Sequence, residues 1–422
     1  MEMVLEFLRD VLSQPALLIG IMSCIGLIAL KRPFHKVMTG TLKPILGYLM
    51  LAAGAGVIVN NLDPLGKMIE HGFHITGVVP NNEAIVAVAQ KVLGVETMSI
   101  LVVGLLMNLC IARFTKFKYV FLTGHHSLFM ACLMSAVLGT AGLSGMELIL
   151  VGGFLMGAWS AISPAIGQSY TSKVTEGDEI AIGHFGSLGY YLSAWVAKYV
   201  GKADDSTEDI EIPEKWGFLR DSTLSTALTM IVFYLIAAFA AGSEFVATLS
   251  GDMSPYLYAV MSAMNFAVGV TIVYSGVRMI LGDLIPAFQG IATKIIPNAI
   301  PAVDCAVFFT YAPTAVVLGF ISSFIGGIIG MLILGAVGGV LIIPGLVPHF
   351  FCGATAGIYG NATGGRRGAA VGAFLNGLAI TFLPALALPV LGQLGFQNTT
   401  FGDADFAVMG LVLGHAFEWI GM

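Results

Sequence analysis

The sequence predicts an all-α polytopic membrane protein, with about 11 transmembrane helices, re-entrant or broken segments and two structurally repeated halves. Of its 422 residues, 57% are hydrophobic and only 10% are charged, and the mean hydropathy is +0.89. A soluble domain carries about 25% charged residues, so nearly every part of this chain must cross a bilayer or link two crossings. The 53 glycines fit broken helices, because glycine tolerates the backbone geometry at a break.

The charges and motifs exclude several classes of function. The net charge of −6, from 19 basic and 25 acidic residues, is too diffuse to indicate nucleic-acid binding. No phosphate-binding loop of the form G-x-x-x-x-G-K-[ST] occurs, so this chain alone does not drive pumping with ATP. The five cysteines form no C-x-x-C pair, which supports neither a metal site nor a redox motif, and we expect no cofactor.

Five apolar segments of the first half are predicted to be membrane spans. They run at about 15–30, 46–60, 98–112, 119–139 and 148–166. Basic clusters follow the first and third spans, from Lys31 to Lys43 and from Arg113 to Lys118. Lys and Arg near the ends of spans mark the cytoplasmic side, so we expect the N-terminus to lie outside.

A short apolar piece, Ala84 to Ala89, lies between the second and third spans, directly after Asn82 and Glu83. It cannot cross a bilayer about 30 Å thick, which needs about 20 helical residues. We interpret it as either a re-entrant hairpin or an exposed loop. In the first case Asn82 and Glu83 face a cavity, and in the second they lie at a wet loop tip.

One long hydrophilic stretch, residues 201–221, separates the two halves. It is rich in acidic side chains. Because successive spans cross the membrane in alternating directions, the number of preceding spans places it on the cytoplasmic side. It is interpreted as a solvated linker or as a docking surface for a soluble partner.

The second half follows a similar plan. Its predicted pieces are spans at about 223–241, 256–280 and 368–391, an interrupted piece at 283–301, a glycine-rich run at 314–343 and an apolar tail. The pattern Ile-Ile-Pro-x-x-x-Pro-x-x-x-Cys occurs twice, ending at Cys305 and at Cys352. Proline disrupts a helix, so both copies indicate broken segments, and paired broken segments point to the binding site of a membrane transporter.

Ionisable side chains inside the apolar runs are the candidate site residues. His125 and His126 lie in the fourth span, His184 lies in an interrupted segment, and Asp304 follows the first proline motif. Hydrocarbon solvates such groups poorly, so each is a functional candidate, although each could instead tie helices together. We hypothesise that they converge on one buried substrate site. There the imidazoles would bind hydroxyl groups of the substrate. Asp304 would accept hydrogen bonds from these hydroxyl groups or act as a general base.

Several motifs carry a resemblance to one family. They are Thr123-Gly124-His125, Ile182-Gly183-His184, Ala302 to Ala306, Ala312 to Phe320 and Leu341 to Gly345. Together, and in this order over nearly the whole chain, they resemble the membrane subunit (EIIC) of the ascorbate-type phosphoenolpyruvate-dependent sugar phosphotransferase system.

The resemblance implies a homodimer in the bacterial inner membrane. Each subunit would have a V-shaped scaffold and dimerisation domain (1–62 and 222–281) and a substrate-binding core (63–200 and 282–395). A cytoplasmic linker (201–221) and a C-terminal apolar segment (396–422) complete the chain. The core would move like an elevator against the scaffold. A separate EIIB protein, charged on a cysteine, would phosphorylate the sugar, and an EIIA protein would recharge EIIB, so the phosphoryl donor residue lies on a partner.

The resemblance also implies a set of substrate contacts. By position these are Asn82, Glu83, His125, His126, Phe129, His184, Phe185 and Asp304. Phe129 and Phe185 stand where ascorbate members carry glutamines, and Asn82-Glu83 stands where they carry Thr-Tyr. Aromatic rings suit the apolar face of a sugar, and a carboxylate binds hydroxyls better than an enediol anion. Ascorbate and a neutral sugar or polyol are therefore both candidate substrates.

A second class of function remains open, a proton-coupled or facilitative secondary transporter of a sugar or organic anion that works through His125, His184 and Asp304. Uptake that collapses with the proton gradient, and persists without the phosphoryl relay, would identify it. The doubled broken segments argue against a third class, a membrane sensor that transports nothing.

Overall fold

The computed structural model describes residues 11, 14–74, 77, 78, 80, 82–210, 222–392 and 400–420. Helices dominate these ranges, in agreement with the predicted class of membrane protein. In chain order the elements are α2 (Pro15–Ala29), α3 (Phe34–Gly72), α4 (Asn82–Phe114), β1 (Tyr119–Phe121), α5 (Gly124–Thr140), α6 (Gly145–Thr175), β2 (Ala181–Ile182), α7 (Ser187–Val200), α8 (Ser222–Ala241), α9 (Ser243–Ser250), α10 (Pro255–Lys294), β3 (Ile300–Val303), the 3-10 helix η2 (Cys305–Thr310), α11 (Pro313–Ala336), α12 (Leu346–Gly392) and α13 (Ala404–Ile420).

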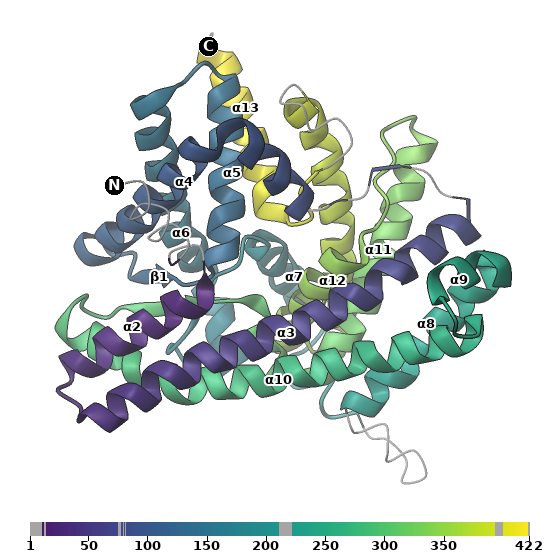
Figure 1. The fold of residues 1–422 in the computed structure, drawn as a ribbon, viewed down its shortest axis with the longest axis horizontal. Helices are drawn as coiled ribbons and strands as arrows, with labels where there is room; N and C mark the ends of the chain where they lie inside the picture. The colour runs from purple at the N-terminus through teal and green to yellow at the C-terminus, as the bar shows by residue number, and fades with distance from the viewer. Residues whose placement is uncertain are drawn as a thin grey trace.

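Helices α3 and α10 lie side by side across the molecule, with α2 near one end and α8 and α9 near the other (Figure 1). We call these five helices the long-helix group. Two glycine pairs allow the close approach, Gly47 with Gly276 and Gly54 with Gly269. A Cβ atom on any of these four would lie 2.6 to 2.9 Å from its partner's carbonyl oxygen. Small residues therefore set the spacing of the two helices, as at many helix contacts in membranes.

The remaining elements form a second set, which we call the strand group. In it α12 packs against both α11 and α7, while α4 packs against α5 and α6, and α13 packs against α12 and α5. The domain boundaries expected at 62 and 281 fall inside helices α3 and α10, which continue to Gly72 and Lys294.

The expected number of about 11 membrane spans is not confirmed. Among the described residues six helices are long and apolar enough to cross a membrane, or seven if α8 and α9, bent by 117°, form one span. The span predicted at 119–139 is instead strand β1 followed by the largely buried, 17-residue helix α5. Helices α7 and α13, with 14 and 17 residues, are also shorter than the roughly 20 residues that a crossing needs.

The piece from Ala84 to Ala89 is the first part of helix α4, which begins at Asn82. The backbone of this piece is helical, so the interpretation as an exposed loop is wrong. The side chain of Glu83 lies outside the described part of the chain.

Both proline motifs begin in breaks between helices, as predicted. The first connects α10 to β3 and η2. The second begins between α11 and α12, where Ile342 forms a parallel bridge with Val78, and continues into the first turns of α12. The two copies differ in local structure, since Pro301 lies within β3 whereas Pro348 lies in the first turn of α12. A structural repetition of the two halves is thus not confirmed.

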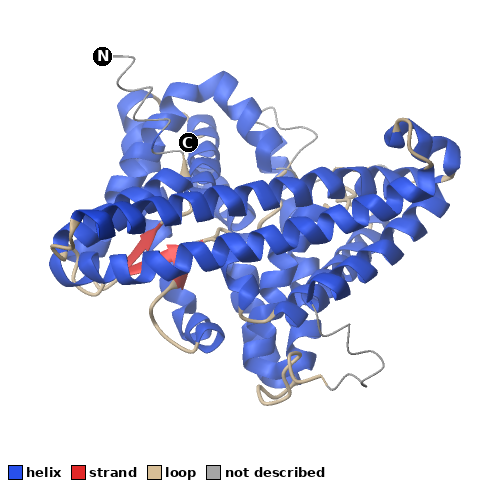
Figure 2. Cartoon of the chain, turned by 60° about the horizontal axis from the view of Figure 1, so that its bottom comes forward, coloured by secondary structure: helices blue, strands red, loops and turns tan. Residues whose placement is uncertain are grey.

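The three strands form a parallel sheet in the order β1–β3–β2, which lies beside the long helices (Figure 2). Tyr119 pairs with Ile300, and Ala181 pairs with Ala302. Strands of two to four residues are too short to leave a periodic pattern in an apolar sequence, so they could not be predicted. Because parallel strands end at one edge of a sheet, the residues that follow them are brought together.

Residues 201–210, the described part of the acidic stretch, contact the start of α11 and the break within α12 at Gly364 and Gly365. Side chains such as Asp204 and Asp209 are exposed, and the solvated linker and the docking surface both stay predictions. The Asp205 carboxylate pairs with Arg366 at 2.5 Å, and the Asp205 carbonyl accepts a hydrogen bond from the Arg366 amide. The Glu208 carboxylate accepts hydrogen bonds from the amides of Thr314 and Ala315 at the start of α11. Residues 211–221 lie outside the described part.

We expect Gly365→Ala to destabilise the protein at this contact. Gly365 has φ 61° and ψ −154°, a conformation almost restricted to glycine, and a Cβ atom would press against the carbonyl oxygens of Lys202 and Asp205. The matched control is Gly338→Ala, since Gly338 also has a positive φ but has open space around its Cβ position. The drop in melting temperature of detergent-purified protein should be at least roughly twice as large for Gly365→Ala. Equal drops would contradict the packing described here.

Candidate functional site

A cavity of about 730 Å³ lies between α3 and the edge of the sheet at which the strands end. This volume is in the range of sites for small molecules. Its polar lining residues are Gln14, Tyr48, Asp63, Lys67, Glu70, Asn82, His125, His126, His184, Asp304, Cys305 and Asp403. The long-helix group therefore supplies one wall of the cavity and the strand group supplies the other.

The strand ends position the predicted polar residues. Helix α5 starts shortly after β1 and carries His125 and His126 in its first turn. His184 follows β2 after a single glycine, and Asp304 directly follows β3. The hypothesis that these histidines meet Asp304 is confirmed as geometry, although the residues are up to 179 positions apart (304 − 125).

Asp304 is held from two sides. Its Oδ1 accepts a hydrogen bond from the amide of Ala306 and so caps η2, while its Oδ2 lies 3.4 Å from Nε2 of His125. On the other side of the imidazole, Nδ1 of His125 lies 3.2 Å from the hydroxyl of Tyr48 on α3. If His125 donates its hydrogen to Asp304, the Tyr48 hydroxyl donates to Nδ1. This chain of contacts joins the strand group to the long-helix group.

His126 and His184 lie ring to ring, with centroids 3.8 Å apart. The amide of Phe185 donates to Nδ1 of His126, and the amide of Gly186 donates to Nδ1 of His184. The Tyr190 hydroxyl also lies 2.8 Å from Nδ1 of His184. Because a backbone amide is only a donor, both Nδ1 atoms act as acceptors, and this network assigns the ring hydrogens to Nε2. The pair therefore offers two N–H donors.

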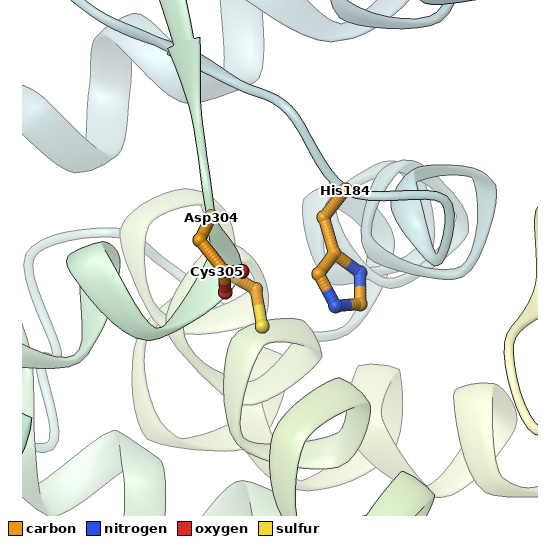
Figure 3. Close-up of side chains that lie close together, drawn as sticks. All are labelled: His184, Asp304 and Cys305. Atoms are coloured by element: carbon orange, nitrogen blue, oxygen red, sulfur yellow. The ribbon is translucent and has the colours of Figure 1, made fainter. Parts of the chain in front are cut away.

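Two groups of side chains place potential metal ligands within 4.8 Å of one another, and both contain His184. One adds Asp304 and Cys305, which Figure 3 shows directed toward the same space, and the other adds Cys352 and Asp403. Nitrogen and sulfur ligands of this kind suit zinc. However, a neutral His184 that accepts at Nδ1 carries its hydrogen on Nε2, and such a nitrogen donates rather than coordinates. The arrangement therefore fits hydroxyl groups better than a metal ion.

Asn82 and Asp403 form a second polar contact across the cavity wall. The Asn82 amide donates to Oδ2 of Asp403 at 2.5 Å, and the Asn82 carbonyl accepts from the amide of Gly402. The thiol of Cys352 donates to Oδ1 of Asp403 at 2.7 Å. The start of α4 is thus fastened to the segment before α13, which places Asp403 beside His184.

Asp405, two residues beyond Asp403, does not line the cavity. It is fully buried, and its oxygens accept hydrogen bonds from the Ser187 hydroxyl and the Leu188 amide at the start of α7. A carboxylate at a helix N-terminus is favourable, because the free amides there carry partial positive charge. Asp405 therefore fixes the start of α13 against the His184 turn.

The predicted aromatic contacts lie in different places. Phe129 lines the cavity, one turn along α5 from His125, with their ring centroids 5.8 Å apart. Phe185 is fully buried outside the lining, where its ring stacks on Phe121. Phe185 thus reaches the site through its backbone amide, which holds His126.

Asp403 and Tyr48 line the cavity but were not among the residues predicted from the sequence. The sequence could have indicated Asp403 but not Tyr48. Asp403 is an acid in the Gly-Asp-Ala-Asp sequence that opens the apolar tail, and an ionisable residue in such surroundings is a functional candidate by default. Tyr48 leaves no such signal, because it is one of 12 tyrosines in the chain and lies in an apolar segment.

Comparisons with known proteins identify the family of this chain. The model of a family described as "PTS system sugar-specific permease component", where PTS denotes the phosphotransferase system, matches residues 10–405. The ascorbate-specific PTS system EIIC component of Mycoplasma pneumoniae is 28% identical over 417 positions, which cover 84% of this chain and 62% of that protein. This chain therefore spans less than two thirds of its curated relative. Because the family model covers nearly the whole chain, the protein belongs to the sugar-specific permease components of the phosphotransferase system.

Proposed function

We propose that this chain is the membrane permease (EIIC) of a phosphoenolpyruvate-dependent phosphotransferase system for ascorbate or a related sugar or polyol. The substrate binds in the cavity and is translocated in a step coupled to its phosphorylation by a separate EIIB. The observation that carries the proposal is the convergence of His125, His184 and Asp304 on one cavity, in a chain of this family.

In the proposed reaction a phosphocysteine of EIIB transfers its phosphoryl group to a substrate hydroxyl. An oxygen–phosphorus bond forms, the sulfur–phosphorus bond breaks, and the hydroxyl proton must leave. Asp304 is the candidate base, because it lines the cavity and its Oδ2 lies beside His125. Phosphoryl transfer depends mainly on positioning and electrostatics, so the other lining residues orient the substrate. EIIA then recharges EIIB.

The proposal also assigns a motion. The long-helix group is the scaffold, which pairs with a second copy in a homodimer, and the strand group is the core that moves against it as an elevator. The cavity's position between the groups supports this division. In the bacterial inner membrane the N-terminus lies outside, and residues 201–210 lie on the cytoplasmic side near the EIIB dock.

Tyr48→Phe tests the link between the groups. The change removes the hydroxyl that contacts His125 but keeps the buried ring. One hydrogen bond contributes about 1 kcal/mol, so the populations of the two core positions should shift by roughly fivefold. We expect the initial uptake rate to change by up to that factor, and by more than the substrate Kd changes. Tyr234→Phe is the control, because Tyr234 bonds the Asn61 carbonyl inside the long-helix group. Equal effects of both variants would contradict the assignment.

The function itself is tested with membrane vesicles that contain the chain and a panel of labelled sugars, polyols and ascorbate. Each compound is offered with and without phosphoenolpyruvate and the soluble relay proteins. We expect one compound to accumulate as its phosphate ester, and only when the relay is present. Uptake that needs no relay and collapses with the proton gradient would replace the proposal with secondary transport through the His125–Asp304 pair.

A further inference from the structure

The cavity has an excess of acidic groups, and two of these lie in its buried part. Asp304 and Asp403 are 7% and 4% exposed, whereas the remaining acids, Asp63 and Glu70, belong to α3. Lys67 is the one Lys or Arg side chain among the described lining residues, and it is paired with Asp63 at 2.8 Å. No lysine or arginine in the described lining is therefore free to neutralise the two buried carboxyl groups.

Both buried carboxyl groups accept hydrogen bonds from groups of the protein. At Asp403 one oxygen accepts from the Cys352 thiol and the other from the Asn82 amide. At Asp304 one oxygen accepts from the Ala306 amide and the other faces His125. A carboxylate oxygen has two lone-pair sites, so each of these oxygens can accept a further hydrogen bond from a ligand.

The imidazole of His184 lies near both buried carboxyl groups. His184 lies within 4.8 Å of a ligand atom of Asp304 and within the same distance of one of Asp403. Its ring lies against that of His126, and both imidazoles carry their hydrogen on Nε2. The buried end of the cavity therefore holds two carboxyl acceptors, with the His184 imidazole near both of them.

We propose that Asp403 is a second substrate-binding carboxylate and that, with Asp304, it makes the site selective for an uncharged polyhydroxyl compound over an anion. This inference rests on the proposed function and names the substrate class of that same site. A hydroxyl group both donates and accepts, so neighbouring hydroxyls satisfy the carboxylates and the imidazoles together. An enediolate such as ascorbate offers negative charge to two buried carboxylates, and like charges repel strongly where water is scarce. Phe129 supplies the apolar wall for the carbon chain.

The first measurement is equilibrium binding to the purified full-length protein at pH 7, with a panel of uncharged hexitols, pentitols and aldoses beside ascorbate. At least one uncharged compound is expected to bind roughly tenfold or more tightly than ascorbate, because one lost charge-assisted hydrogen bond already has that effect. The inference is overturned if ascorbate binds more tightly than every uncharged compound.

The second measurement compares Asp403→Asn with Asp405→Asn. Both variants remove one acidic group from the same short segment, but only Asp403 lines the cavity. Asp403→Asn should weaken binding of the uncharged compound by about tenfold or more and lower its preference over ascorbate, because one carboxylate no longer repels the anion. Asp405→Asn should lower the melting temperature and leave the preference between the two ligands unchanged. An unchanged preference in Asp403→Asn overturns the role of Asp403, whatever its effect on stability.

Failure of this inference is distinguishable from failure of the proposed function. Binding is measured without the relay, so it does not depend on phosphorylation. Relay-dependent phosphorylation of ascorbate as the preferred substrate keeps the proposed function and overturns the selectivity. Tight binding of an uncharged polyol without relay-dependent phosphorylation keeps the selectivity and overturns the coupling.

Discussion

Asp304→Asn is expected to reduce relay-dependent phosphorylation of the substrate by at least about a hundredfold, because a positioned general base contributes 10² to 10⁴ in rate. The amide cannot take up the hydroxyl proton, and it replaces the acceptor that His125 faces at 3.4 Å. The substitution is otherwise mild. Asn caps a helix about as well as Asp, so the hydrogen bond from the Ala306 amide that starts η2 can remain.

The measurement is the initial rate of phosphate-ester formation in vesicles with the complete relay, beside the melting temperature and the substrate Kd of the purified variant. We expect a near-normal melting temperature and a rate loss that exceeds the loss in affinity. A rate within about tenfold of the wild type would remove Asp304 from the role of base. A rate loss fully matched by weaker binding would leave Asp304 as a binding residue only.

The convergence of the site could be predicted from the sequence because ionisable groups are rare in this chain. His125, His184 and Asp304 each interrupt an apolar run, and a membrane environment gives such residues few acceptable places. The structural cause could not be predicted. The strands that bring them together have two to four residues, and their apolar sequences look like parts of membrane spans.

The expected number of spans is not confirmed for a related reason. Hydropathy reports that a segment avoids water, but it does not tell lipid from protein interior. Helix α5 avoids water by burial among other helices, with residues from Met130 to Leu138 inside the core. The pairing of Asn82 with Asp403, across 321 positions, depends on that same packing and leaves no local pattern.

His184→Ala is expected to weaken substrate binding by roughly 10- to 150-fold, the effect of losing a hydrogen bond to a charged or strongly polar partner. His184 belongs to both clusters of polar groups, so a ring nitrogen of His184 lies within 4.8 Å of an oxygen of Asp304 and of one of Asp403. The hydrogen assigned to its Nε2 is a donor for the substrate. Its removal also frees the Tyr190 hydroxyl, which lies 2.8 Å from the imidazole. Some loss of stability is therefore expected beside the loss of binding.

The chain offers a matched control in His349→Ala. His349 is equally buried, at 2% exposure against 4% for His184, and it bonds the Ser323 hydroxyl at 2.9 Å, but it does not line the cavity. Its loss leaves Ser323 without that partner, which costs about 1–3 kcal/mol of stability. The substrate Kd of this variant should stay within about twofold of the wild type, since no contact to the cavity is removed. Comparable loss of binding in both variants would mean that the Kd follows general destabilisation, and His184 would then be a structural residue that happens to face the cavity.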